Sequence, residues 1–150
     1  MASTPVERTL LSVNDESLTV ADPSEDVRAH GLVDRDGKRF GTVDDLLVDA
    51  GERKVRFLQV QEGGFLGVGG RRFLIPVDAI VKIDGDVVHI DRTGKHVGAG
   101  PTYDPAIAND DVWRREAFRD GGYFEGLYAH YGYPPFWTPG YVDPGYPLHV

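Results

Sequence analysis

The sequence predicts a mainly β protein: a small, closed or partly open β-barrel of about six strands, followed by one α-helix and an irregular tail rich in aromatic residues and proline. Three observations support this fold class. Short stretches of alternating or β-branched apolar residues recur between residues 27 and 92, turn-forming dipeptides separate them, and aromatic residues and prolines crowd residues 121–150. A barrel is favoured over an open sheet because closing so short a series of strands removes exposed edges.

Turn chemistry divides the barrel region into strands. Asp36-Gly37 and Asp84-Gly85 are Asp-Gly dipeptides, which are favoured where a hairpin turn needs a positive φ. Residues 54–61 show the clearest alternation of apolar and polar side chains. Only Leu58 departs from this period, as expected if part of the strand is covered on both faces. In chain order, the predicted strands span residues 27–33, 40–49, 54–61, 73–76, 80–83 and 87–91.

Composition divides the chain into three regions: an N-terminal arm or hairpin at 1–26, the barrel domain at 27–97, and a C-terminal extension at 98–150. In the arm, two short alternating pieces, 10–13 and 18–20, flank a turn-rich segment, which is typical of a weak hairpin. A chain of 150 residues suits one such domain with appendages.

The C-terminal extension is predicted to hold one helix, at about 110–120, before a tail at 121–150. Asn109-Asp110-Asp111 can cap the start of this helix, and Gly121-Gly122 can stop it. Its apolar stripe would consist of Val112, Trp113, Ala117 and Phe118. The tail holds 9 of the 16 aromatic residues and 5 of the 10 prolines, so irregular or polyproline-like backbone is expected there instead of regular helix or sheet.

Composition also excludes several function classes. The formal net charge of −8 argues against nucleic-acid binding, because phosphate neutralisation needs clustered Lys and Arg. The chain has no cysteine, so disulfides and thiolate metal sites are ruled out. No window approaches 18 uninterrupted apolar residues, and the first residues lack the pattern of a secretory signal. A cytoplasmic protein without a membrane span is therefore expected.

Each candidate catalytic or ligand-binding motif lacks residues that its chemistry requires. The glycine-dense stretch at 63–70 leads into Arg71-Arg72 and a strand, whereas a phosphate-binding P-loop needs Lys-Ser/Thr and a helix. Lys38 occupies the position where an EF-hand that starts at Asp34 needs an oxygen ligand. The five histidines show no metal-ligand spacing, and no serine lies in a nucleophile elbow. We expect no metal, no cofactor and no enzymatic activity.

Two sets of residues are candidates for partner binding. The first is the apolar tip of the glycine-dense loop, Phe65, Leu66 and Val68, which could contact a partner or a second copy. The second lies in the tail: Tyr131, Tyr133, Pro134, Phe136, Trp137 and Tyr141. These tail residues suit a strap that folds back over the domain, a recognition segment for a partner, or a tail exchanged between subunits.

The barrel region resembles a known module. Val27–Asp49 is similar to the start of the PRC-barrel, the domain shared by the H subunit of photosynthetic reaction centres and the C-terminal half of the ribosome maturation factor RimM. The resemblance continues through Val55–Leu58, Leu74–Pro76 and Val87–Ile90, and Gly98–Tyr103 resembles the segment after the barrel in H-type proteins. It implies a PRC-type barrel whose common role is docking.

One position departs from the H-subunit pattern. The resemblance places a glutamate that aids proton delivery after the Arg-aromatic-Leu of the third strand, but here Gln59 stands at that position and cannot carry a proton in the same way. H subunits also carry an N-terminal membrane-spanning helix, and no such segment is present in this sequence.

The function expected from these observations is that of a non-catalytic adaptor, assembly or protein-interaction module. Its partners would be proteins, including a second copy that associates through the barrel edge or the tail. The alternative is a protein that binds a small ligand or cofactor, with the aromatic tail as a lid. An enzyme with an unrecognised site is a third hypothesis.

Overall fold

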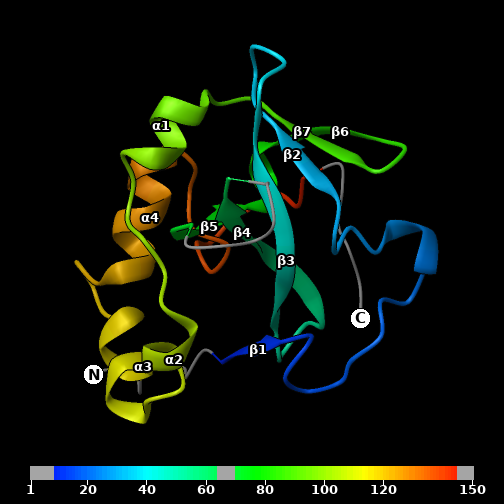
Figure 1. The fold of residues 1–150 in the computed structure, drawn as a ribbon. Coiled ribbons are helices and arrows are strands. Elements are labelled where there is room, and N and C mark those ends of the chain that lie inside the picture. Colours follow the sequence, from blue (N-terminus) through cyan, green and yellow to red (C-terminus); the bar gives the residue numbers. More distant parts are fainter. Residues whose placement is uncertain (1–8, 64–69, 145–150) are drawn as a thin grey trace.

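The structure is a computed structural model that describes residues 9–63 and 70–144. It consists of one sheet of seven strands followed by four helices, which gather on one side of the sheet (Figure 1). The strands are β1 (Leu10–Ser12), β2 (Gly31–Val33), β3 (Arg39–Asp49), β4 (Lys54–Glu62), β5 (Arg72–Pro76), β6 (Ile80–Asp84) and β7 (Val87–Ile90). The helices are α1 (Gly94–Gly98), α2 (Pro105–Ala108), α3 (Asp111–Ala117) and α4 (Tyr123–Tyr131), with two 3₁₀ turns, η1 (Pro23–Glu25) and η2 (Val77–Ala79).

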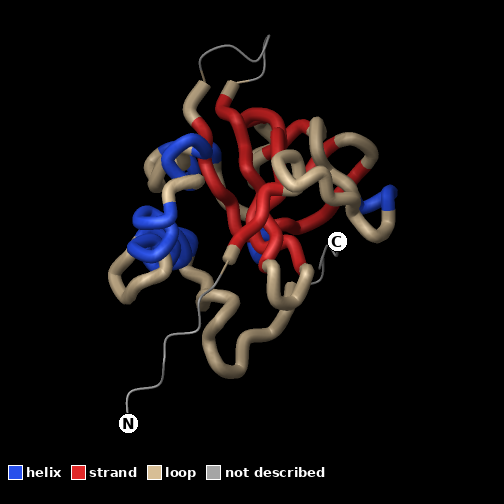
Figure 2. The backbone as a smooth tube through the Cα atoms, turned by 90° about the horizontal axis from the view of Figure 1, so that it is seen from below, coloured by secondary structure: helices blue, strands red, loops and turns tan. Residues whose placement is uncertain are grey.

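The strand order is β5-β4-β3-β2-β7-β6, and β1 pairs with one end of β3. All pairs are antiparallel except β2 with β7. The strands curve around a common core (Figure 2), but hydrogen bonds do not close the sheet, because β5 and β6 form its two ends. The prediction of a mainly β, closed or partly open barrel is confirmed in its partly open form, and each of the six predicted strands has a counterpart.

The N-terminal part differs from the prediction in two places. The strand expected over 27–33 begins only at Gly31, because Ala29 adopts a φ of 70°, which interrupts extended backbone. The piece at 10–13 does not pair with 18–20 in a hairpin. It forms β1, which pairs with the end of β3 through Leu10 and Asp49.

In the acidic turn between β2 and β3, the Asp34 side chain stabilises the fold by binding backbone amides. Its carboxylate is buried and accepts hydrogen bonds from the backbone N–H groups of Asp36, Lys38 and Gly94. Burial would raise the pKa of Asp34, but these amides outweigh it and lower the pKa. The carboxylate therefore joins the hairpin turn to the start of α1.

The prediction of irregular backbone throughout 121–150 is wrong for α4. The five prolines of the tail all follow Tyr133, so they leave residues 123–131 free to form a helix. Gly122 is the N-cap of this helix, and Gly132 ends it with a φ of 79°, in the left-handed region. The prolines therefore mark where the helix has already ended.

The helices after the barrel are also more numerous than predicted. The helix expected at 110–120 corresponds to α3, and Asp110 caps it by accepting a hydrogen bond from the N–H of Trp113. On this helix, Val112 is 65% exposed, so it does not belong to the predicted apolar stripe, whereas Ala117 is buried. The short helices α1 and α2 were not predicted because each is little longer than one helical turn.

The core joins the barrel to α4. Phe57 of β4 is fully buried, and its ring lies 5.3 Å from that of Phe124 and 5.4 Å from that of Tyr128. Leu127 and Tyr131 of the same helix are buried as well. Because α4 packs directly on the barrel core, the C-terminal extension is part of the folded unit.

Candidate interaction sites

The chain after α4 folds back over its own barrel. We call residues 133–144 the strap. The hydroxyl of Tyr133 donates to the carboxylate of Asp91, with both oxygens at 2.8 Å, and the Arg92 guanidinium lies 4.8 Å from the Tyr133 ring centroid. Arg92 also donates to the backbone oxygen of Tyr131. These contacts fix the start of the strap next to the end of β7.

Arg56 of β4 is the centre of the surface beneath the strap. It is only 3% exposed, although it occupies a polar position in the alternating pattern of its strand. Its guanidinium lies 4.7 Å from the ring centroid of Phe136 and 5.7 Å from that of Tyr141. Two strap aromatic residues therefore cover a cation that the sequence pattern places on the barrel surface.

Three carboxylates neutralise Arg56. It forms ion pairs with Glu52 at 2.8 Å, with Asp143 of the strap at 3.1 Å, and with Asp49 at 3.7 Å. Burial lowers the pKa of Arg56, but these acidic neighbours outweigh it and raise the pKa. Asp143 also pairs with Lys54, so one strap residue joins two basic residues of the same strand.

Asp78 of η2 provides a third attachment point for the strap. The Tyr141 hydroxyl donates to its Oδ2 at 2.9 Å. Burial raises the pKa of Asp78, and the hydrogen bond from Tyr141 opposes that rise. Its Oδ1 and the Nε of nearby Arg56 are both buried without a hydrogen-bond partner among the described residues.

The predicted tail residues are thus largely turned inward. Trp137 lies edge-on to Phe118 and Tyr128, with ring centroids 5.5 and 5.8 Å away. Tyr131 is buried, while Pro134 is exposed. In this structure the tail has the arrangement of a strap over its own domain. The loop candidates Phe65, Leu66 and Val68 lie outside the described residues.

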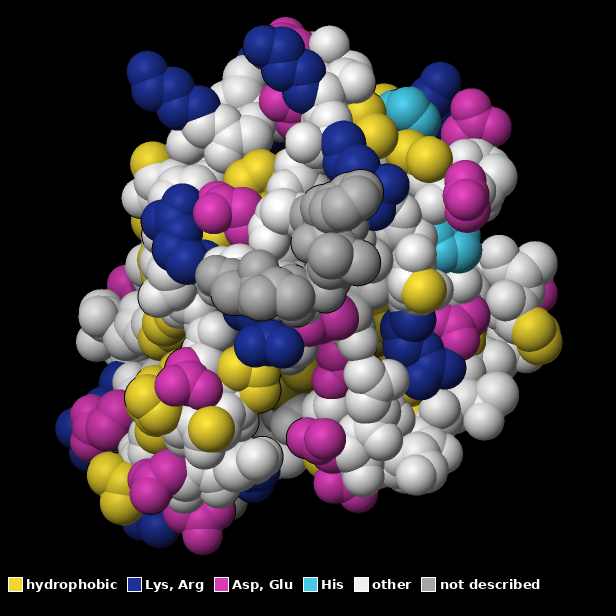
Figure 3. Space-filling model, viewed as in Figure 1, with side chains coloured by type: hydrophobic (Ala, Val, Ile, Leu, Met, Phe, Trp, Pro, Cys, Tyr) yellow, Lys and Arg dark blue, Asp and Glu magenta, His cyan; other side chains and the backbone are white. Residues whose placement is uncertain are grey.

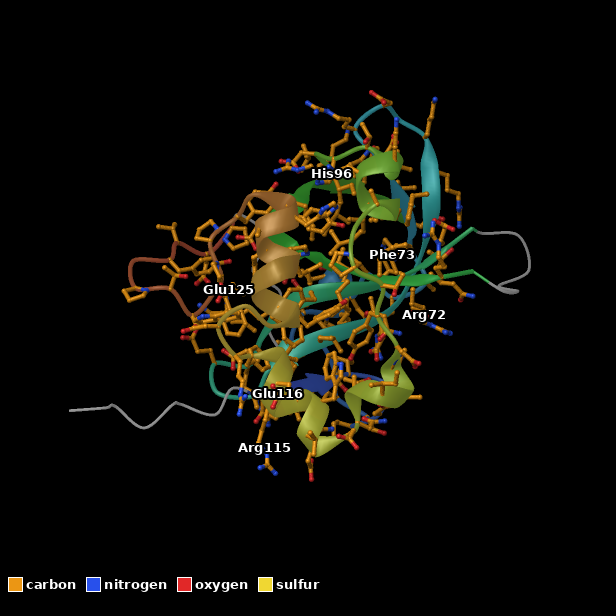
Figure 4. All side chains as sticks on the ribbon, turned by 90° about the vertical axis from the view of Figure 1, so that its left-hand side faces the viewer. Arg72, Phe73, His96, Arg115, Glu116 and Glu125 are labelled. Carbon is orange, nitrogen blue, oxygen red and sulfur yellow. The ribbon has the colours of Figure 1, made fainter. Side chains whose placement is uncertain are left out.

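A second polar feature, which sequence reasoning missed, joins α1 to α4. The rings of His96 and His130 stack with centroids 4.1 Å apart (Figure 4 labels His96). Each ring Nε2 hydrogen-bonds the backbone oxygen of the other residue, at 2.8 and 2.7 Å. Within residues 9–63 and 70–144, no group of three or more His, Asp or Glu side chains is placed to hold a metal ion.

An open polar cleft of about 410 Å³ lies where β1, the middle of β3 and β5 meet the chain before α2. Its charged and hydrogen-bonding lining includes Asp15, Asp44, Asp45, Arg72, Tyr103 and Asp104. Four carboxylates against one guanidinium give this cleft a negative charge. Sequence reasoning did not identify it, because its residues come from five separate segments.

The innermost carboxylates of the cleft already have partners. Asp44 accepts from Arg72 Nε at 3.0 Å and from Gln59 Nε2 at 2.8 Å. Asp45 is buried and accepts from the Ser12 hydroxyl and from the N–H of Asn14 at 3.1 Å. These bonds fix the side chains in place.

Tyr103 supplies a hydroxyl to the same cleft. Burial and the nearby charge of Asp45 raise the pKa of Tyr103 to about 12, so it stays protonated at neutral pH and can donate a hydrogen bond. The cleft therefore offers fixed acceptors, one fixed guanidinium and one phenolic donor.

Figure 3 shows the charges of one face. Basic side chains of the described residues lie beside acidic ones there. The ion pairs of the molecule include Arg71 with Glu62 and Arg72 with Asp44. None of the helices in the described part of the chain is long and apolar enough to cross a membrane.

Comparison with known families identifies one domain. The family model of the PRC-barrel domain matches residues 24–97, which run from η1 through α1. No curated protein matches the sequence.

Proposed function

Residues 24–97 form a PRC-barrel domain, and from this premise we propose that the chain is a non-catalytic protein-interaction module that acts as an adaptor or assembly factor in the cytoplasm. The observation that carries the proposal is the polar cleft on the barrel surface. Because its lining is negatively charged, the partner segment that suits it is basic, with donors for the carboxylates of Asp15 and Asp104.

The chemistry of the cleft favours recognition over catalysis. A general base needs a free acceptor whose pKa lies near the working pH. Asp44 and Asp45 instead accept hydrogen bonds from fixed donors of the protein. Tyr103 keeps its proton at neutral pH. Groups held in this way keep one arrangement of donors and acceptors, which suits a partner that docks and leaves unchanged.

A capture experiment tests this function. The variant Asp15→Lys with Asp104→Asn removes negative charge from the cleft, and asparagine at 104 can still cap α2. The matched control is Glu125→Lys with Glu116→Gln, which changes the net charge equally at exposed positions of α4 and α3 (Figure 4). Tagged forms of all three proteins are incubated with extract of the native cell, and bound proteins are quantified by mass spectrometry.

We expect the wild type and the control to retain the same protein partner. The amount of this partner bound to the cleft variant should fall by about tenfold or more, because the loss of a few screened charge contacts of about 1 kcal/mol each is enough for that change. Binding should also weaken as salt is raised. Equal retention by all three proteins would show that the cleft is not the docking site. Turnover that persists through purification would contradict the non-catalytic role.

A second candidate is a small-ligand protein with the strap as its lid. It is favoured by the two buried polar atoms without partners beneath the strap, Arg56 Nε and Asp78 Oδ1, because buried polar groups normally have partners. A ligand with one acceptor and one donor would satisfy both. Native mass spectrometry of protein purified without denaturant checks this: a bound small molecule supports the lid function, and the bare chain mass alone contradicts it.

A further inference from the structure

One end of the sheet presents an unpaired strand edge. β6 is the last strand in the sheet order, and β7 is its partner on one side only. No backbone hydrogen bond joins its other side to any described residue. Val81 on this strand is 53% exposed, and the strand contains no proline to block pairing. The β6–β7 hairpin projects away from the helices (Figure 1).

The hairpin geometry indicates which backbone groups point outward. Asp84 pairs with Val87 across a turn of two residues, in which Gly85 has a φ of 61°. A two-residue hairpin turn closes on a hydrogen-bonded pair, and such pairs alternate along an antiparallel ladder. Asp84 therefore bonds toward β7, whereas the N–H and C=O of Ile83, one residue before it, face away from the sheet.

We propose that this edge binds the same edge of a second copy of the chain, antiparallel, with Ile83 opposite the partner's Ile83. This inference rests on the proposed interaction function and names one partner for it. In this register the outward N–H and C=O groups of the two Ile83 residues bond each other. Lys82 then stands opposite the partner's Asp84, and the two-fold symmetry repeats that pair.

The side chains of β6 select this register. Ile83 packs against the core, so the two Ile83 side chains extend one apolar face across the junction. Lys82 and Asp84 are exposed, so their cross-strand pairs form on the solvent side. A shift of one residue would misalign the outward backbone groups. Centring the pair on Gly85 would set Asp84 against the partner's Asp86, and like charges directly opposite are destabilising.

An edge lysine usually protects a strand from pairing with other sheets. Lys82 retains that role toward an unrelated edge, because its charge is compensated only where an acid stands opposite. When two copies of Lys82-Ile83-Asp84 lie antiparallel, the lysine of each copy faces the aspartate of the other. This edge therefore favours pairing with another copy of itself.

Charge exchange tests the pairing. Lys82→Asp and Asp84→Lys each place like charges opposite each other twice in the dimer, whereas the double variant restores two opposite-charge pairs with their positions exchanged. Lys95→Asp, at an exposed position on α1, is the control. The dimer dissociation constant is measured by sedimentation equilibrium up to the highest soluble concentration, and circular dichroism verifies that each variant is folded.

We expect a weak dimer of the wild type, a rise of about tenfold in the dissociation constant for each single variant, and recovery to within about threefold in the double variant. Hydrogen exchange at the Ile83 amide should slow as protein concentration rises, while exchange at Ile90 should not change. A wild type that stays monomeric, a double variant as weak as the singles, or an Ile83 amide insensitive to concentration would overturn the proposal. The cleft double variant, which leaves β6 intact, should still dimerise, so loss of partner capture and loss of dimerisation are separable.

Discussion

The strap should contribute measurably to stability, and Trp137→Ala tests this most directly. Trp137 is half-buried and packs edge-on against Phe118 and Tyr128. Truncating a fully buried Trp costs about 3–5 kcal/mol. With part of the ring already in solvent, we expect a loss of about 2 kcal/mol in the free energy of unfolding. For a chain of this size, that lowers the melting temperature by about 4–8 °C.

The assay is thermal unfolding followed by far-UV circular dichroism at neutral pH. Val142→Ala is the control, because Val142 lies in the same strap and is 82% exposed, so its truncation should shift the melting temperature by less than about 1 °C. If Trp137→Ala melts together with this control, the strap does not stabilise the folded domain, and a recognition role for the tail becomes the better interpretation.

Three further changes follow from single contacts. Burial raises the pKa of Asp78, so the charged form of this side chain destabilises the fold at neutral pH. Asparagine at this position carries no charge and can still accept the hydrogen bond from Tyr141. Asp78→Asn should therefore have a higher melting temperature than the wild type at about pH 7. That difference should shrink as the pH falls to about 3, below the ordinary aspartate pKa, because Asp78 is then protonated in the folded and the unfolded chain alike. Melts at both pH values check this, and a constant difference would contradict it. Gly126→Ala, in α4 with no atom within 4 Å of the added Cβ, should stabilise by up to about 1 kcal/mol in urea unfolding. Gly41→Ala places its Cβ 2.0 Å from the backbone oxygen of Gln61, so this variant should give no soluble folded protein, and a native melt would contradict the close approach of β3 and β4.

The sequence predicts the barrel well because strand signals are local. The alternation over 54–61 and the Asp-Gly turns depend on neighbouring residues, and the strand β4 and the two turns appear at the expected places. The prediction for the tail misses α4, because proline excludes helix only near its own position and all five tail prolines follow Tyr133. The local signal for this helix is the proline-free stretch bounded by Gly122 and Gly132.

The candidate sites were only partly predictable. Composition identifies the aromatic residues of the tail, but it does not identify the surface on which they pack. Arg56 occupies a polar, surface-type position in the pattern of its strand, and only the strap buries it. The available signal was the acid Asp143 within an aromatic tail, which suits a basic partner. The stacked pair of His96 and His130 depends on how α1 and α4 meet, and no local pattern encodes that.

The parallel pairing of β2 with β7 has a consequence for how the molecule is made. Gly31 pairs with Thr42 of β3 on one side, but its partner on the other side is Val87, at the far end of the barrel region. In contrast, β3, β4 and β5 can form a meander from strands that are neighbours in the chain. Contacts between residues so distant in the chain slow folding, since a long loop must close before they form. During synthesis, β2 therefore lacks one of its two neighbouring strands, and the sheet is completed only after β7 has left the ribosome.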